Sequence, residues 1–234
     1  MDTRVLALCE LSNDLLYHKI PKRQLPFYVD ESLRMGTAAA AVLKGQSIEE
    51  LYREHRIEIC CQEDGKGAFG MAYRGQITLA KEGCSVMIFE SSVRELAEYS
   101  YSGGNGGSSG NHGNIGNCGM EPVDYQLAKE IHLAHEFFHF LEFESLGYVS
   151  KLLPEIVTME VFGLKRRAAV NRCSEVAAHA FAKELLSLKV LPNYYDYRYL
   201  INTGKMSEMS FGEMTDKYGN VLNRNEADKM LEIT

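Results

Sequence analysis

The sequence lacks several features that would each have indicated a particular class of protein. It contains no apolar stretch that approaches the roughly 20 residues of a membrane-spanning helix. The apolar run near the N-terminus breaks off too early for a secretion signal. The net charge of −7 and the isoelectric point near 5.6 leave no excess of positive charge for binding phosphates. We therefore expect neither a membrane partner nor a nucleic-acid partner.

Cysteine is present, but its spacing lacks the pattern of a metal-binding or redox motif. None of the six cysteines belongs to a C-x-x-C pair. Their number is even, but the chain is long and shows no secretion signal, so we interpret them as reduced thiols. Together these observations predict a cytoplasmic protein. The six are Cys9, Cys60, Cys61, Cys84, Cys118 and Cys173.

The most informative segment that is present is His135-Glu136-Phe137-Phe138-His139, which matches the H-E-x-x-H pattern of zinc peptidases. On a helix, residues i and i+4 lie one above the other, so both imidazoles can reach one tetrahedral ion. Glu136 then overhangs the open coordination position, where it can take a proton from zinc-bound water. The pattern predicts His135 and His139 as metal ligands and Glu136 as the general base.

The residues around this motif predict a buried helix. At 100° per residue, one stripe of apolar side chains runs along it, and other apolar residues cover most of the rest. Asp124 is the predicted N-cap and Gly147 the predicted stop. Buried histidines and a glutamate need partners, and the alternative is that hydrogen bonds satisfy them, with Glu136 paired to a lysine or arginine. The stripe comprises Leu127, Ile131, Ala134, Phe138 and Leu141.

A catalytic zinc site needs a third protein ligand, and the spacing excludes one class of zinc peptidase. The metzincins place a histidine six residues after the second one, but that position is Ser145. The segment 172–186 offers a better candidate, because Glu175 and His179 share one face of its predicted helix. Small residues at 177, 178, 180 and 182 would let this helix approach another closely. We therefore predict Glu175 as the third ligand.

With this second segment the sequence resembles the ImmA/IrrE family of metallo-endopeptidases. His-Glu-x-x-His is followed, after about three dozen residues, by Glu-x-x-Ala-x-x-Phe-Ala-x-x-Leu-Leu. The resemblance covers roughly residues 30–192. It implies zinc on the two histidines and the glutamate, with Glu136 as general base. The matching residues are His135, Glu136, His139, Glu175, Ala178, Phe181, Ala182, Leu185 and Leu186.

Three positions depart from the family pattern and concern the shape of the substrate cleft. Phe138 stands where the family usually has a small glycine, His179 where it commonly has a short amide or acid, and Pro192 comes later than the usual proline. His179 has three interpretations: it orients a metal ligand, it donates to the oxyanion of a tetrahedral intermediate, or it packs in the core. His132, one turn before His135, is expected to support a ligand or to lie at the surface, and it would be a ligand itself only if Glu175 is not.

The order of the predicted elements indicates an α+β fold of the zincin-like kind. We expect a small mixed or antiparallel sheet packed on the buried motif helix, with helices at both ends of the chain. A Gly-Gln-Ser turn between two early helices is similar to a DNA-reading helix-turn-helix, but Glu49, Glu50 and Glu54 would face phosphate there. The predicted helices span 5–18, 30–44, 47–54 and 91–99, the last capped by Ser91, and the strands span 57–61, 69–73, 76–80 and 85–89.

We divide the chain into an N-terminal helical segment (1–55), a catalytic core (56–192) and a C-terminal extension (193–234). Within the core, residues 102–119 are almost wholly glycine, serine and asparagine, which is typical of a flexible connector. Alternatively this loop is a flap whose His112 or Cys118 occupies the open zinc position in a latent state. The extension holds a group of tyrosines, for which packing is favoured over donation to the oxyanion: Tyr194, Tyr195, Tyr197 and Tyr199.

These features predict a zinc-dependent endopeptidase in which metal-activated water attacks the peptide bond. The substrate would be a protein or peptide that lies extended along an edge strand of the sheet. The family resemblance implies a regulatory target such as a transcriptional repressor. Two alternatives stay open: a general peptidase of another zincin family, and a non-catalytic regulatory module whose metal serves sensing or structure.

Overall fold

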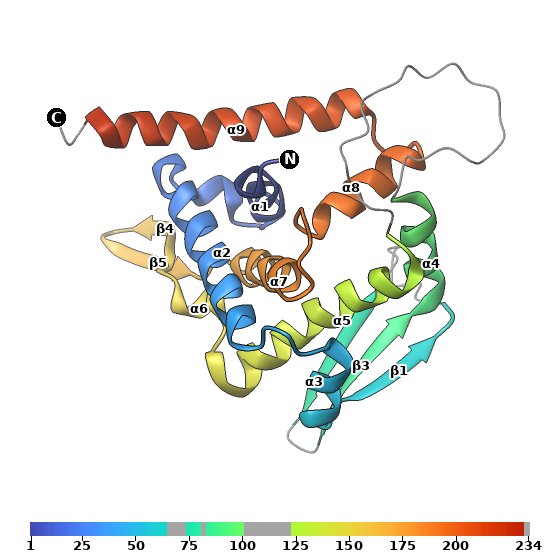
Figure 1. Ribbon diagram of the computed structural model, residues 1–234. Coiled ribbons are helices and arrows are strands. Elements are labelled where there is room, and N and C mark those ends of the chain that lie inside the picture. Colours follow the sequence, from blue (N-terminus) through green and yellow to red (C-terminus); the bar gives the residue numbers. More distant parts are fainter. Residues whose placement is uncertain (65–73, 81–82, 101–122, 232–234) are drawn as a thin grey trace.

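The chain folds into a mixture of helices and two small sheets (Figure 1), in a computed structural model that describes residues 1–64, 74–80, 83–100 and 123–231. This confirms the predicted α+β class. No helix within the described ranges is both long and apolar enough to span a bilayer. The helices are α1 (Thr3–Leu11), α2 (Leu25–Val42), α3 (Ile48–Glu54), α4 (Glu90–Tyr99), α5 (Tyr125–Leu141), α6 (Val149–Leu152), α7 (Arg172–Leu185), α8 (Asn193–Asn202) and α9 (Glu208–Leu231). The strands are β1 (Glu58–Gln62), β2 (Gly75–Ala80), β3 (Gly83–Phe89), β4 (Ile156–Val161) and β5 (Leu164–Ala168).

The larger sheet has three strands in the order β1-β3-β2. Strand β1 runs parallel to β3, with Glu58 opposite Ser85, while β2 runs antiparallel to β3, with Ile77 opposite Val86. Both β2 and β3 contact α5, which lies against this sheet on one side and against α7 on the other (Figure 1). The expected small mixed sheet packed on the motif helix is therefore present, with β2 at one edge of its three described strands.

Helix α7 lies between α5 and α2, and its small residues allow the close approach that the sequence predicts. A Cβ atom placed on Gly36 of α2 would lie only 2.0 Å from the carbonyl oxygen of Ala177. Any side chain at that position would collide with the backbone of α7. Glycine at 36 and alanine at 177 thus bring the two helices together, and α7 is held from both sides.

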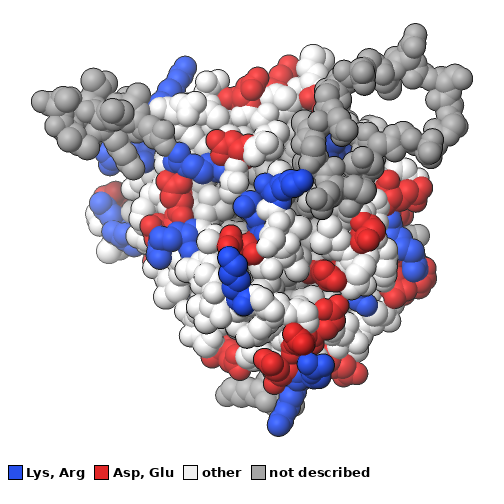
Figure 2. All heavy atoms as spheres, viewed as in Figure 1, with Lys and Arg blue, Asp and Glu red and all other residues white. Residues whose placement is uncertain are grey.

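The helices at the two ends of the chain pack on one another. Helix α1 contacts α7, α8 and α9, and α9 runs across α1 in Figure 1. The side-chain amide of Asn193 donates to the carbonyl oxygen of Leu6 at 2.9 Å, and the rings of Tyr17 and Tyr218 meet edge to face. On the face drawn in Figure 2, acidic and basic side chains are interspersed over the surface.

Several predicted boundaries are wrong for local reasons. The first helix ends at Leu11, not at residue 18, because the Asp14 side chain accepts the amide of Leu16 at 2.7 Å and turns the chain. Helix α2 starts at Leu25, five residues before the predicted start, since Pro26 fits the first turn of a helix. Helix α4 follows β3 directly, so Phe89, not Ser91, is its N-cap residue.

Other predicted elements are confirmed closely. Ser47 caps α3 in a reciprocal capping box with Glu50. Strands β1, β2 and β3 lie within two residues of their predicted ranges. The strand predicted at 69–73 and the loop at 102–119, with His112 and Cys118, lie outside the described residues.

The hairpin β4–β5 was not predicted. Its strands pair from Ile156 opposite Ala168 to Val161 opposite Leu164, which leaves a two-residue turn. Both turn residues have positive φ, +50° at Phe162 and +79° at Gly163, as in a type I′ turn. The hairpin connects the segment after α5 to the start of α7, so it lies in the chain between the two predicted ligand segments.

Candidate metal centre

Helix α5 carries the H-E-x-x-H motif and is buried as predicted. The Asp124 side chain accepts the amide of Leu127 at 2.8 Å and caps the helix, and Gly147, with φ of +76°, ends the π-helical turn that follows it. Ile131, Ala134 and Phe138 of the predicted stripe are buried, whereas its two end members are only partly so. Phe138 fills the core against Phe181 of α7, with ring centroids 5.5 Å apart. The bulky residue at this position is therefore accommodated in the core, where its ring also meets the His139 ring edge to face, with centroids 6.3 Å apart.

The structure brings the three predicted ligands together. The Nε2 atoms of His135 and His139 are 3.2 Å apart, and His135 Nε2 lies 3.2 Å from a carboxylate oxygen of Glu175. The other Glu175 oxygen is 3.7 Å from His139 Nε2. Ligands bound at about 2.1 Å to a tetrahedral ion are separated from one another by roughly 3.4 Å. These three side chains could therefore hold a metal ion with little movement.

The electrostatics of the three ligands favour a cation among them. Burial lowers the pKa of His135, but hydrogen bonding and attraction to Glu175 outweigh it and raise the pKa to about 9. Burial raises the pKa of Glu175, and its hydrogen bond to His135 together with the nearby His139 lowers it well below the ordinary value. Without a metal ion, a proton on His135 balances the negative charge of the Glu175 carboxylate. A metal ion would replace that proton as the positive charge.

Glu136 lies beside these ligands and is held by the sheet. One of its carboxylate oxygens accepts the backbone N–H of Ile77 in β2 at 3.0 Å. A Cβ on Gly75 would lie 3.3 Å from the Glu136 side chain, so the start of the strand passes close to it. The carboxylate is thus fixed between α5 and the edge strand without belonging to the ligand group.

Glu142, which was not predicted to be part of the site, contacts His139 at Nδ1, the ring nitrogen that does not face the other two candidate ligands. Its Oε2 atom lies 2.9 Å from His139 Nδ1. Its Oε1 atom accepts the N–H of Val149 and the hydroxyl of Ser174, both at 2.7 Å. The available signal was its position three residues after His139, which places it on the same side of a helix.

His179 lies against His135 but outside the ligand group. Their ring centroids are 4.8 Å apart, and His179 Nε2 is 3.9 Å from the carboxylate of Glu10 in α1. Burial, and then the neighbouring His135, lower its pKa to about 3, so the ring is neutral. Its buried Nδ1 has no hydrogen-bond partner among the described residues. Its burial and its contact with His135 are compatible with an orienting role, with an oxyanion donor and with core packing, and all three stay predictions.

Two further buried groups border the site. His132 Nε2 is buried and has no hydrogen-bond partner within the described ranges, and burial lowers the pKa of this ring well below its usual value. Burial raises the pKa of Glu10, although Arg172 donates to this carboxylate at 2.9 Å. Glu10 is the contribution of α1 to the site, and no pattern in the sequence indicated that the first helix would reach it.

The tyrosines of the C-terminal segment contribute to packing and to hydrogen bonds outside the ligand group. The hydroxyl of Tyr199 donates to Glu95 at 3.0 Å, and Arg74 and Lys205 lie over its ring. The ring of Tyr197 packs on Phe211, with centroids 5.0 Å apart. These contacts agree with the packing interpretation of the two residues.

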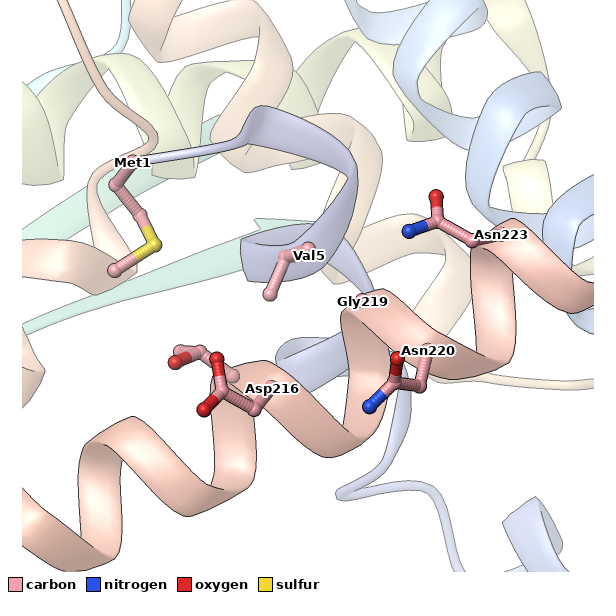
Figure 3. Close-up of a pocket in the computed structure, with 7 residues that line it drawn as sticks. Met1, Val5, Asp216, Gly219, Asn220 and Asn223 are labelled. Atoms are coloured by element: carbon pink, nitrogen blue, oxygen red, sulfur yellow. The ribbon is translucent and has the colours of Figure 1, made fainter.

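A shallow depression lies elsewhere, between α1 and α9 (Figure 3). It is lined mostly by small and polar side chains, among them Asp216, Asn220 and Asn223, around Gly219. None of its lining residues belongs to the metal centre. It therefore has no part in the chemistry considered below.

Comparisons of the chain with protein-family models, with curated proteins and with solved structures find no match.

Proposed function

We propose that the protein is a zinc-dependent endopeptidase with a zincin-like site. The observation that carries this proposal is the convergence of His135, His139 and Glu175, with Glu136 beside them. A site that served structure alone would close the fourth position with another protein ligand and would need no base. Here the described residues supply three ligands and one adjacent carboxylate. The motif spacing that resembles the ImmA/IrrE family supports the same conclusion.

Zinc is the metal that this ligand set fits best. Two imidazole nitrogens and one carboxylate oxygen, at separations suited to a tetrahedron, are a recurrent catalytic zinc set. Zinc, when bound, would polarise the scissile carbonyl and lower the pKa of a water molecule from above 15 to about 7. Glu175 is the most exposed of the three ligands, at 34% of its side chain, so solvent and substrate can approach from its side.

Glu136 is the proposed general base. It would take a proton from the attacking water and pass it to the leaving amine. The hydrogen bond from Ile77 keeps one carboxylate oxygen against β2. This contact orients the other oxygen for proton transfer and limits the freedom of the side chain.

The substrate would be a protein or peptide that lies along β2. Among the strands that the structure describes, β2 is at the edge of its sheet, and the N–H of Ile77 points away from β3, since it donates to Glu136. An extended segment added to this edge would run past the base. By analogy with the resembled family, the target is a regulatory protein such as a transcriptional repressor.

Metal analysis of matched variants tests the proposal. We expect about one zinc ion per chain in the unmodified protein and loss of that ion in His135→Ala and Glu175→Ala. His18→Ala and Glu144→Ala are the controls, since both side chains are exposed and neither touches the site. Glu136→Gln should keep the zinc and lose peptide hydrolysis by about 10²–10⁴-fold.

The Glu136→Gln variant and a cleavage assay separate the alternatives. If the Glu136→Gln variant binds zinc and retains every biological effect of the unmodified protein, the protein is a non-catalytic regulatory module. Cleavage of many unrelated sequences in a peptide library would instead indicate a general peptidase. One cut in one protein would favour the regulatory endopeptidase.

A further inference from the structure

The carboxylate of Glu142 is completely buried and receives hydrogen bonds from three directions. It follows α5 in the π-helical turn η4 (Glu142–Leu146). Val149 offers a backbone N–H from the start of α6, and Ser174 offers its hydroxyl from the first turn of α7. His139 meets the remaining oxygen at 2.9 Å. A buried charge in this position is tolerated because each of its oxygens has a donor.

This arrangement determines which nitrogen of His139 carries the proton. A carboxylate accepts hydrogen bonds, so the short contact requires that Nδ1 of His139 donates. In the neutral ring the lone pair is then on Nε2, which lies 3.2 Å from His135 Nε2 and 3.7 Å from Glu175. A metal ligand needs this lone pair at that nitrogen.

Glu142 also connects the two ligand helices. Ser174, which donates to it, precedes the ligand Glu175 in the first turn of α7. The Ser174 hydroxyl oxygen in turn accepts the N–H of Ser150 at 3.2 Å. One buried carboxylate thus contacts a ligand of α5 directly and the residue beside the ligand of α7.

We propose that Glu142 is the positioning residue of the metal centre: it sets the proton of His139 on Nδ1 and ties the first turn of α7 to the end of α5. The inference rests on the proposed metal site, but its first half concerns a proton that can be located without metal. Substitution of Glu142 should therefore change both the proton position on His139 and the affinity for zinc.

Glu142→Gln is the sharpest variant, because the amide has nearly the same shape. Its oxygen can keep the two donors Val149 and Ser174 only by turning its NH₂ group toward His139. That group donates, so His139 must accept at Nδ1 and carry its proton on Nε2. We expect a 10–100-fold loss of zinc affinity, measured by competition with a chromophoric chelator. Glu144→Gln is the matched control, since it makes the same change two residues away at an exposed position.

NMR of the metal-free protein supplies an independent readout. Ring ¹⁵N–¹H correlations should show His139 protonated at Nδ1 in the unmodified protein and at Nε2 in Glu142→Gln. Ser174→Ala should leave the proton on Nδ1 and weaken zinc binding less, because the contact from Glu142 to His139 remains.

The outcomes separate this inference from the proposed function. A failure of the unmodified protein to bind zinc would overturn the proposed function. Zinc binding that Glu142→Gln leaves unchanged, with the His139 proton still on Nδ1, would overturn only the role of Glu142. If Glu142→Gln does not fold, the unmodified protein still decides, since a neutral His139 with its proton on Nε2 and none on Nδ1 contradicts the inference.

Discussion

The α5–α7 pair and the β4–β5 hairpin are neighbours in the chain but differ in how deeply their residues are buried. The two helices are buried on nearly every side and bring their ligand atoms within 4.8 Å of one another. The hairpin between them has Phe162 fully exposed at its turn and Leu164 exposed at 79%. A metal centre needs side chains held by packing, whereas the connection between its ligands can be almost free of packing.

The hairpin also carries local costs that the helices avoid. Phe162 adopts a left-handed conformation at φ of +50°, which disfavours a residue with a side chain by about 1–2 kcal/mol. The ion pair of Lys165 and Glu160 is exposed, so it contributes about 0–1 kcal/mol. Pairing of two short strands is thus the main stabilisation of the hairpin. We expect substitutions in the helices to affect the whole fold and substitutions in the hairpin to act locally.

The largest effect is expected from Gly36→Ala. The new methyl group would lie 2.0 Å from the carbonyl oxygen of Ala177, which cannot yield without moving α7. We expect a loss of more than about 4 kcal/mol in the free energy of unfolding, in the range of the most damaging substitutions. Denaturant titration followed by circular dichroism would measure it.

Gly212→Ala is the matched control for this prediction. Gly212 is also a helical glycine, but a Cβ there would meet no atom within 4 Å. Alanine should leave stability unchanged or raise it by up to about 1 kcal/mol through helix propensity. Equal effects of the two substitutions would contradict the close contact between α2 and α7.

The share of the structure that could be predicted from the sequence differs between the helical region and the β4–β5 hairpin. In α5 the capping residue, the apolar stripe and the motif all agree, so the helix is predicted in place and its two motif histidines lie where the candidate metal centre needs them. The glycine of α2 gives no local sign that a carbonyl from α7 will approach it, because that contact arises only in the tertiary structure. Glu142 is similar, since two of its three partners come from α6 and α7.

The hairpin escaped prediction for a different physical reason. Most residues of both strands are exposed on both faces, so they lack the alternation of apolar and polar residues that identifies a half-buried strand. The turn is Phe162-Gly163 and not the Asn-Gly or Asp-Gly pair that usually signals a type I′ turn. The alternation of apolar and polar residues reflects burial of one face, so a strand that is exposed on both faces shows no such alternation in its sequence.

Zinc should stabilise the helical region by an amount smaller than the effect of Gly36→Ala and larger than that of a substitution in the hairpin turn. Binding to the native state alone raises the free energy of unfolding by about 2.7 kcal/mol at a zinc concentration of 100 times Kd. For a chain of this size we expect a rise in melting temperature of roughly 5–10 °C. The gain should disappear in His135→Ala. An equal rise in that variant would indicate that zinc binds elsewhere.

Hydrogen exchange can assign that stabilisation to one of the two regions. Amides of α5 and α7 should gain protection with zinc, because opening of either helix would separate the ligands. Amides of β4 and β5 should exchange as before, since none of the three ligands lies in the hairpin. Equal gains in both regions would show that the hairpin and the helices open together, which would break the distinction between them.

The smallest effect is expected from Phe162→Asn in the hairpin turn. Asparagine tolerates the left-handed conformation, and Asn-Gly is the preferred pair for a type I′ turn. We expect the hairpin amides to gain about 0.5–1 kcal/mol of protection in hydrogen exchange, while the global unfolding free energy changes little.

Phe162→Ala is the control, because it removes the same exposed ring but retains the backbone cost. A gain as large in alanine as in asparagine would mean that the exposed ring, and not the backbone, is the source of the cost. A gain that appeared instead in global unfolding would mean that the hairpin folds as one unit with α5 and α7, and that its low burial does not make it independent.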